Sequence, residues 1–109
     1  MSELFGRNPE YTRTIDGISL KVQVLIGMLS VMETYTKDSP HKKDVFGSME
    51  KLLEQLKENQ TGFEIFARRD DLAVNVPFFE RYVKALMHGT PIGNADRNIM
   101  HAIYRRYGV

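Results

Sequence analysis

The chain has 109 residues, the size of a single domain, and its 42% hydrophobic and 27% charged residues exclude an intrinsically disordered protein. It contains no cysteine, which excludes disulfide bonds, thiolate catalysis and cysteine-bound zinc, and favours a reducing compartment. The chain has a formal net charge of +1, so it does not have the strong basic excess that is typical of nucleic-acid-binding domains.

The first 13 residues contain Gly6, Asn8 and Pro9 and show no sustained hydrophobic period, so we expect a loosely tethered N-terminal arm. This stretch also carries charges where a signal peptide needs an apolar segment. The longest uncharged apolar stretch, residues 22–32, has 11 residues, whereas a membrane span needs about 20. We therefore expect a soluble, cytoplasmic protein with no membrane partner.

Residues 14–37 form the first predicted helix, with Thr14 as its N-cap. Apolar residues recur along it at alternating spacings of three and four, as in a coiled-coil seam. A second apolar line follows another face, so the helix is expected to be central in the fold. The second line is then buried either by the other helices or by a partner. The first line is Ile15, Ile18, Val22, Leu25, Leu29 and Met32, and the second is Leu20, Val24, Met28, Val31 and Tyr35.

The middle of the chain predicts two further helices. Residues 38–59 read as an amphipathic helix with Asp38 or Ser39 as its N-cap. A short third helix begins near Thr61, which has capping-box spacing to an acidic residue. Residues 70–76 alternate between polar and apolar side chains, but a lone strand has nothing to pair with, so we expect a connector.

The last third predicts a fourth and a fifth helix. Asn75 is the expected N-cap of the fourth helix, and Gly89 is its left-handed C-cap. Asn94 is the expected N-cap of the fifth helix, which Gly108 ends. Its predicted apolar stripe is Ile99, Ile103 and Tyr107.

These elements predict an all-α, single-domain bundle of four or five helices around the central apolar helix at about residues 14–37. The helical domain comprises residues 14–109 and follows the arm of residues 1–13. Its predicted core is Ile18, Val22, Leu25, Leu29, Met32, Phe46, Met49, Leu53, Leu56, Phe66, Phe79, Val83, Leu86, Ile99 and Ile103.

A helix with two apolar lines in so short a chain favours an interaction protein. The first functional hypothesis is a small non-enzymatic helical protein that binds and regulates another protein as a homodimer. Its binding surface would be the second apolar line together with two aromatic anchors. The predicted interaction residues are Val24, Met28, Val31, Tyr35, Phe78 and Tyr82. The competing interpretation is that the other helices wrap the first one completely.

The alternative hypothesis is a small DNA- or RNA-binding regulator that uses the C-terminal helix, residues 94–107. Residues 72–109 carry two acidic and five basic residues, and Arg and Asn side chains suit guanine and adenine edges. The predicted contacts are Arg97, Asn98, His101, Arg105 and Arg106. Basic residues near a helix C-terminus also offset the helix dipole, which explains the two last arginines without a ligand.

The sequence predicts no enzymatic activity, no metal and no cofactor. The histidines His41, His88 and His101 lack the close helical spacing of metal ligands. No nucleophile elbow, glycine-rich phosphate loop or HExxH motif occurs.

Overall fold

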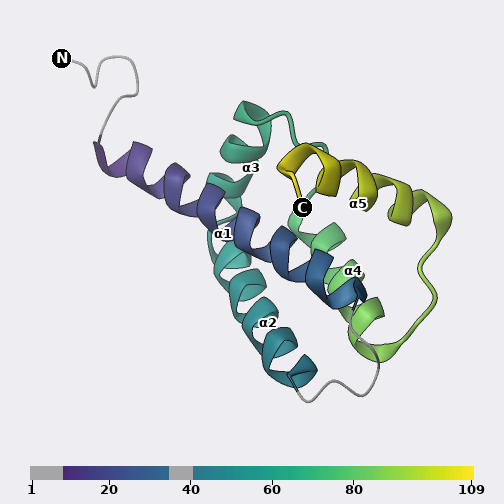
Figure 1. Ribbon diagram of the computed structural model, residues 1–109. Coiled ribbons are helices and arrows are strands. Elements are labelled where there is room, and N and C mark those ends of the chain that lie inside the picture. The colour runs from purple at the N-terminus through teal and green to yellow at the C-terminus, as the bar shows by residue number, and fades with distance from the viewer. Residues whose placement is uncertain (1–8, 35–40) are drawn as a thin grey trace.

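The computed structural model describes the backbone of residues 9–34 and 41–109 and the side chains of residues 15–34 and 41–109. Five α-helices follow one another along the chain, and no strand occurs in these ranges (Figure 1). The predicted all-α class with four or five helices is confirmed. The helices are α1 (Pro9–Thr34), α2 (Lys42–Glu58), α3 (Gln60–Arg69), α4 (Val76–His88) and α5 (Asn94–Tyr107).

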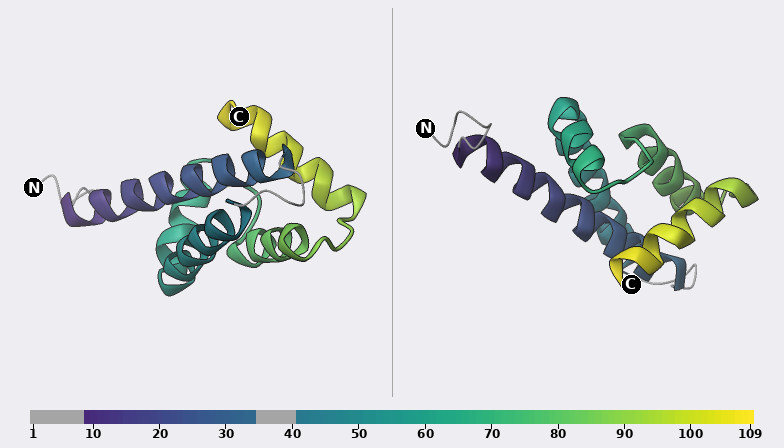
Figure 2. Two further views of the ribbon diagram at one scale, coloured as in Figure 1. Left: turned by 60° about the horizontal axis from the view of Figure 1, so that its bottom comes forward. Right: turned by 90° about the horizontal axis from the view of Figure 1, so that it is seen from above.

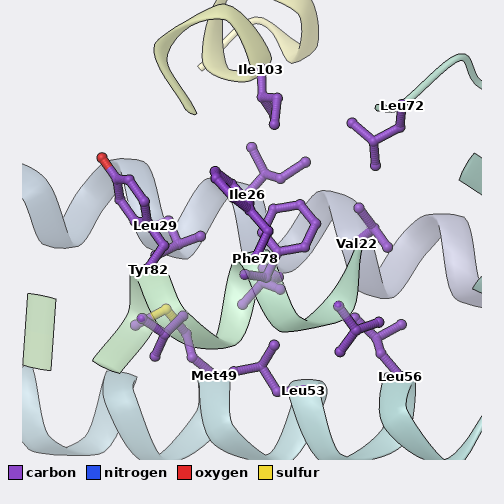
Figure 3. Close-up of a cluster of buried hydrophobic side chains, with 14 of the residues drawn as sticks. Val22, Ile26, Leu29, Met49, Leu53, Leu56, Leu72, Phe78, Tyr82 and Ile103 are labelled. Carbon is purple, nitrogen blue, oxygen red and sulfur yellow. The ribbon is translucent and has the colours of Figure 1, made fainter. Parts of the chain in front are cut away.

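The central position predicted for the first helix is also confirmed, because α2, α3, α4 and α5 all pack against α1 (Figures 1 and 2). The whole first apolar line of α1 is buried, together with Ile26. In Figure 3, Ile103 reaches from α5 toward Ile26 on one side, and Met49 and Leu53 of α2 point toward the same cluster from the other. The helical period therefore places one face of α1 in the core.

The start of α1 differs from the prediction. The helix begins at Pro9, so residues 9–13 are helical rather than part of an arm, and Thr14 is not the N-cap. Proline suits the first helical position because its φ is already helical and it has no N–H that needs a partner. Residues 1–8, and the expected end of the helix at residue 37, lie outside the described residues.

Side-chain caps set two of the helix starts. The Asn75 side chain accepts a hydrogen bond of 2.9 Å from the Phe78 amide, which confirms Asn75 as the N-cap of α4. The N-cap of α3 is Asn59, which accepts from the Gly62 amide at 3.2 Å, so the prediction of Thr61 is wrong. Asn59 follows α2 directly, and one residue therefore ends one helix and starts the next.

The other helix ends agree in part with the sequence. Gly89 and Gly108 end α4 and α5, as predicted. Their φ values of 68° and 73° are left-handed, the conformation predicted for Gly89. Gly93 stands at the N-cap of α5, and Asn94 is instead its first helical residue. His41 is the N-cap of α2, and the predicted caps at residues 38 and 39 lie outside the described residues.

The core prediction is wrong at Ile99, which is 41% exposed, and Leu86 is only partly buried. The remaining predicted core residues are buried. The error at Ile99 comes from the orientation of α5, which turns Met100, Ile103 and Tyr104 toward the core instead. Ile103 belongs to both faces, so the apolar pattern alone does not choose between them.

Residues 70–75, between α3 and α4, form an irregular connector rather than a strand, as predicted, and α5 holds this segment in place. Arg106 donates hydrogen bonds to the backbone carbonyls of Asp70 and Asp71, at 2.7 Å to Asp71. The Tyr107 hydroxyl donates to the Asp70 carboxylate. Side chains near the end of α5 therefore satisfy two backbone carbonyls of a segment that has no strand partner, and also bind one carboxylate.

Candidate interaction surface

The second apolar line of α1 is exposed over most of its length. Leu20 is 64% exposed, Val24 is 41% exposed and Val31 is 45% exposed, while Met28 is partly buried against the core. These residues lie opposite the core face of the same helix because they follow the same helical period with an offset. Tyr35, the last predicted member, lies outside the described residues. Leu20, Val24, Met28 and Val31 are named here the outer face of α1.

Val24, Met28 and Val31 of the outer face lie on the floor of a shallow groove of about 480 Å³. Val45 of α2 and Val109 at the C-terminus form its sides, and the C-terminus lies beside α1 in Figure 1. Only Ser30 among the lining residues has a polar side chain. Neither Val45 nor Val109 stood out in the sequence, because only the packing of α2 and α5 brings them to α1.

Small residues keep the groove open. The lining on α1 comprises Val24, Gly27, Met28, Ser30 and Val31. A Cβ atom added at Gly27 would meet no other atom within 4 Å, so the space above this glycine is empty in the monomer. A neighbouring backbone can approach a helix closely at such a position.

The two faces together give α1 an unusually apolar composition. Residues Ile15–Thr34 have a mean hydropathy of 1.6, which by length and composition is enough for a membrane-crossing helix. Only 39% of the most apolar window is buried inside the fold. The core therefore accounts for one face of α1, and the apolar character of the outer face needs a separate explanation.

The two predicted aromatic anchors do not belong to this surface. Phe78 is 6% exposed and Tyr82 is 2% exposed, so both are core residues and the prediction that they are binding anchors is wrong. The Phe78 ring lies 5.8 Å from the Phe79 ring and 6.0 Å from the Tyr82 ring, between centroids. These separations are typical of packed aromatic pairs.

A polar cluster at the other side of α1 joins three helices. The Glu33 side chain, 14% exposed, accepts hydrogen bonds from the hydroxyls of Tyr82 at 3.1 Å and of Tyr104. Arg97 of α5 forms an ion pair with the same carboxylate at 3.3 Å. Sequence reasoning missed this cluster, because Glu33 stands in a helix that is read as apolar and its three partners come from α4 and α5.

Tyr82, which donates to Glu33, and Tyr107, which donates to Asp70, predict a stability that falls at alkaline pH. Burial first, and then the charge and hydrogen bond of Glu33, raise the pKa of Tyr82 to about 12. Burial, then the hydrogen bond to Asp70, also raises the pKa of Tyr107 to about 12. Because the folded pKa lies above the ordinary value of 10.0, the stabilisation is complete below pH 10 and lost as pH rises toward 12.

We expect the free energy of unfolding, measured with denaturant and circular dichroism, to be flat from pH 8 to about 10 and then to decline. The double variant Tyr82→Phe/Tyr107→Phe has fewer phenols to titrate and should decline less steeply. An equal decline in the variant and the original chain would contradict this assignment.

The residues of α5 that were predicted to contact nucleic acid fall into two groups: some are paired within the fold and others are exposed. Arg97 is paired with Glu33, and Arg106 binds the α3–α4 connector. Asn98, His101 and Arg105 are exposed. Two of the five predicted contact residues therefore have a role in fastening α5 to the rest of the fold.

The packing of α4 and α5 differs from that of a helix-turn-helix. In that motif the two helices are joined by a turn of about three or four residues and form one supersecondary unit. Here α5 packs mainly on α1 and touches α4 only slightly. The main polar link is the contact of Arg81 with Asp96, whose two hydrogen bonds measure 3.1 Å and 3.3 Å.

A second groove, of about 510 Å³, lies between α4 and the loop that precedes α5. Its charged side chains largely satisfy one another or their neighbours. Arg81 is paired with Asp96, and Glu80 with Lys57 at 2.8 Å. Within the part of the chain that the structure describes, no three metal-binding side chains gather at one place.

The chain is thus an all-α bundle with one apolar outer face on its central helix. Comparisons with known protein families, with curated proteins and with solved structures give no match.

Proposed function

We propose that this protein is a non-enzymatic, cytoplasmic interaction protein that binds and regulates another protein through the outer face of α1, and that it acts as a homodimer. The observation that carries the proposal is the exposure of Leu20, Val24 and Val31 in one line on the central helix. Contiguous exposed apolar surface is typical of docking sites, whereas scattered exposed residues are not.

The shape and the lining of the groove fit a helical partner. Its floor is one helix, its sides are the valines of α2 and of the C-terminus, and its lining is almost entirely apolar. Such a groove fits the apolar face of an amphipathic helix. Full burial of one Val or Leu side chain contributes about 1.5–3 kcal/mol, so three partly exposed side chains supply a substantial part of a binding free energy.

The double variant Val24→Glu/Val31→Glu tests the proposal. Both side chains lie on the outer face, so the fold should persist while any complex that buries them is lost, because a carboxylate buried without a partner is strongly unfavourable. Met28 is left unchanged because it packs against the core. We expect light scattering after size-exclusion chromatography to show a folded monomer in place of the complex formed by the original chain.

The matched control is Ser48→Glu/Gln55→Glu. These two residues are exposed on α2 and have the same spacing as the pair on α1. The control should keep the association of the original chain. Equal association in both double variants would contradict a docking role for the outer face, and an unfolded Val24→Glu/Val31→Glu chain would show that these valines are needed by the core.

Nucleic-acid binding through α5 stays a second prediction, supported by the exposure of Asn98, His101 and Arg105. We rank it below protein binding because Arg97 and Arg106 already have partners within the fold. If the prediction holds, short duplex DNA binds with an affinity that falls steeply with salt and that Arg105→Ala weakens.

A further inference from the structure

We propose that the groove on the outer face is filled by α1 of a second copy of this chain, with the two helices antiparallel and Leu20 of each copy seated in the groove of the other. This inference rests on the proposed function and names the second copy as the occupant of the outer face in the homodimer, so any other protein that binds this face competes with the second copy. It follows from three features of α1: an exposed leucine, a groove further along the same face, and the sizes of the residues between them.

Leu20 and the groove lie on the same face of α1 but at different positions along the helix axis. Leu20, with 64% exposure, is the most exposed of the large hydrophobic side chains that the structure describes. It does not line the groove, whose floor begins at Val24 and continues to Val31. A projecting side chain and a recess on the same face are the two halves of an isologous contact, because a two-fold axis between them pairs each with the other.

The residues of the outer face are complementary in size when α1 is reversed against itself. If the two-fold axis passes between Leu25 and Ile26, Leu20 faces Val31 of the second copy. Val24 then faces Gly27 of the second copy, where an added Cβ would meet nothing within 4 Å in the monomer. A valine opposite a glycine is a knob opposite a hole, and it lets the two helices approach closely.

A parallel arrangement is less favourable for both steric and electrostatic reasons. It places Leu20 against Leu20 and leaves each groove without a projecting side chain. Antiparallel helices also have favourably opposed dipoles.

The area fits a small dimer interface. The outer face from Leu20 to Val31 is about 17 Å long and a helix with its side chains is about 10 Å wide, so α1 alone presents a strip of roughly 170 Å². Val45 and Val109 add to the contact at the sides, and an interface of this size is typical of a weak dimer rather than of a permanent one. The N-terminal turns of α1 extend past the other helices, so a second copy can lie alongside (Figure 2).

Cysteine cross-linking tests the pairing, because the chain has no cysteine of its own. Leu20→Cys and Val31→Cys chains are prepared separately, one with an affinity tag that changes its mass, and are then mixed and oxidised. A disulfide needs Cα atoms about 4.4–6.8 Å apart. In the antiparallel dimer only the mixed pair meets this limit, because two copies of the same residue lie roughly 16 Å apart along the helices.

We therefore expect the mixed disulfide from the two chains together and little disulfide from either chain alone. Same-residue disulfides would overturn the antiparallel arrangement. The absence of cross-links, together with a monomer in light scattering at about 100 μM, would overturn the second copy as the partner. That result leaves the proposed function standing if a captured protein still requires Val24 and Val31, and the proposed function fails if it does not.

Gly27→Ala gives an independent readout of the same contact. The added methyl group meets nothing in the monomer but fills the space that Val24 of the second copy would occupy. We expect the dissociation constant of the dimer to rise by about 10-fold or more, while the monomer keeps its thermal stability or gains some. The control is Gly47→Ala on α2, which has the same free space and lies outside the groove. An equal effect of both substitutions would overturn the proposed pairing.

Discussion

Leu25→Ala is expected to lower the free energy of unfolding by about 3 kcal/mol, whereas Leu20→Ala on the same helix is expected to change it by less than about 0.5 kcal/mol. Leu25 is fully buried, at 0% exposure, and Leu20 is 64% exposed. Truncation of Leu25 removes buried methyl groups and leaves a cavity, while truncation of Leu20 removes atoms that are already in contact with water. Both changes give alanine in one helix, so helix propensity cancels in the comparison.

Denaturant unfolding followed by circular dichroism measures this difference. The protein concentration is kept low so that self-association adds little to the stability of the original chain, with which the Leu20 variant is compared. A loss at Leu25 that is no greater than at Leu20 would mean that the two faces of α1 are equally covered in solution. The outer face would then no longer be available as a docking surface.

Glu33→Ala is the second large effect, an expected loss of about 3 kcal/mol in the free energy of unfolding. The carboxylate is the acceptor for the hydroxyls of Tyr82 and Tyr104, and both tyrosines are buried. A buried hydroxyl that loses its acceptor costs about 1–3 kcal/mol. Arg97, with 43% of its side chain exposed, can turn to water and contributes less.

Two further variants separate the lost hydrogen bonds from the lost packing. Glu33→Gln keeps one acceptor oxygen and should lose about half as much stability. The triple variant Glu33→Leu/Tyr82→Phe/Tyr104→Phe removes the donors together with their acceptor and should recover most of the loss, since matched removal of both partners is nearly neutral. Equal stability of Glu33→Ala and the original chain, in thermal or denaturant unfolding, would exclude the cluster as a fastening point for α5.

The sequence determined the elements of this protein and the role of its central helix. The alternating spacings along residues 15–32 predicted the buried line of α1, and the described residues bear this out. Local chemistry also placed Asn75 at the start of α4, a left-handed glycine at the end of α4 and a glycine at the end of α5. These features depend on neighbours within one or two turns, so they can be read from a single chain.

The tertiary structure decided what those elements do together. Met100 rather than Ile99 of α5 faces inward, and the same orientation brings the Tyr104 hydroxyl to Glu33 of α1. The groove on the outer face required Val45 and Val109, which are brought to α1 from far along the chain. The apolar pattern of α4 does not show whether Phe78 is an exposed anchor or a core residue. Contacts between residues distant in sequence settle burial and charge pairing, because local pattern fixes a helix but not the neighbours against which it packs.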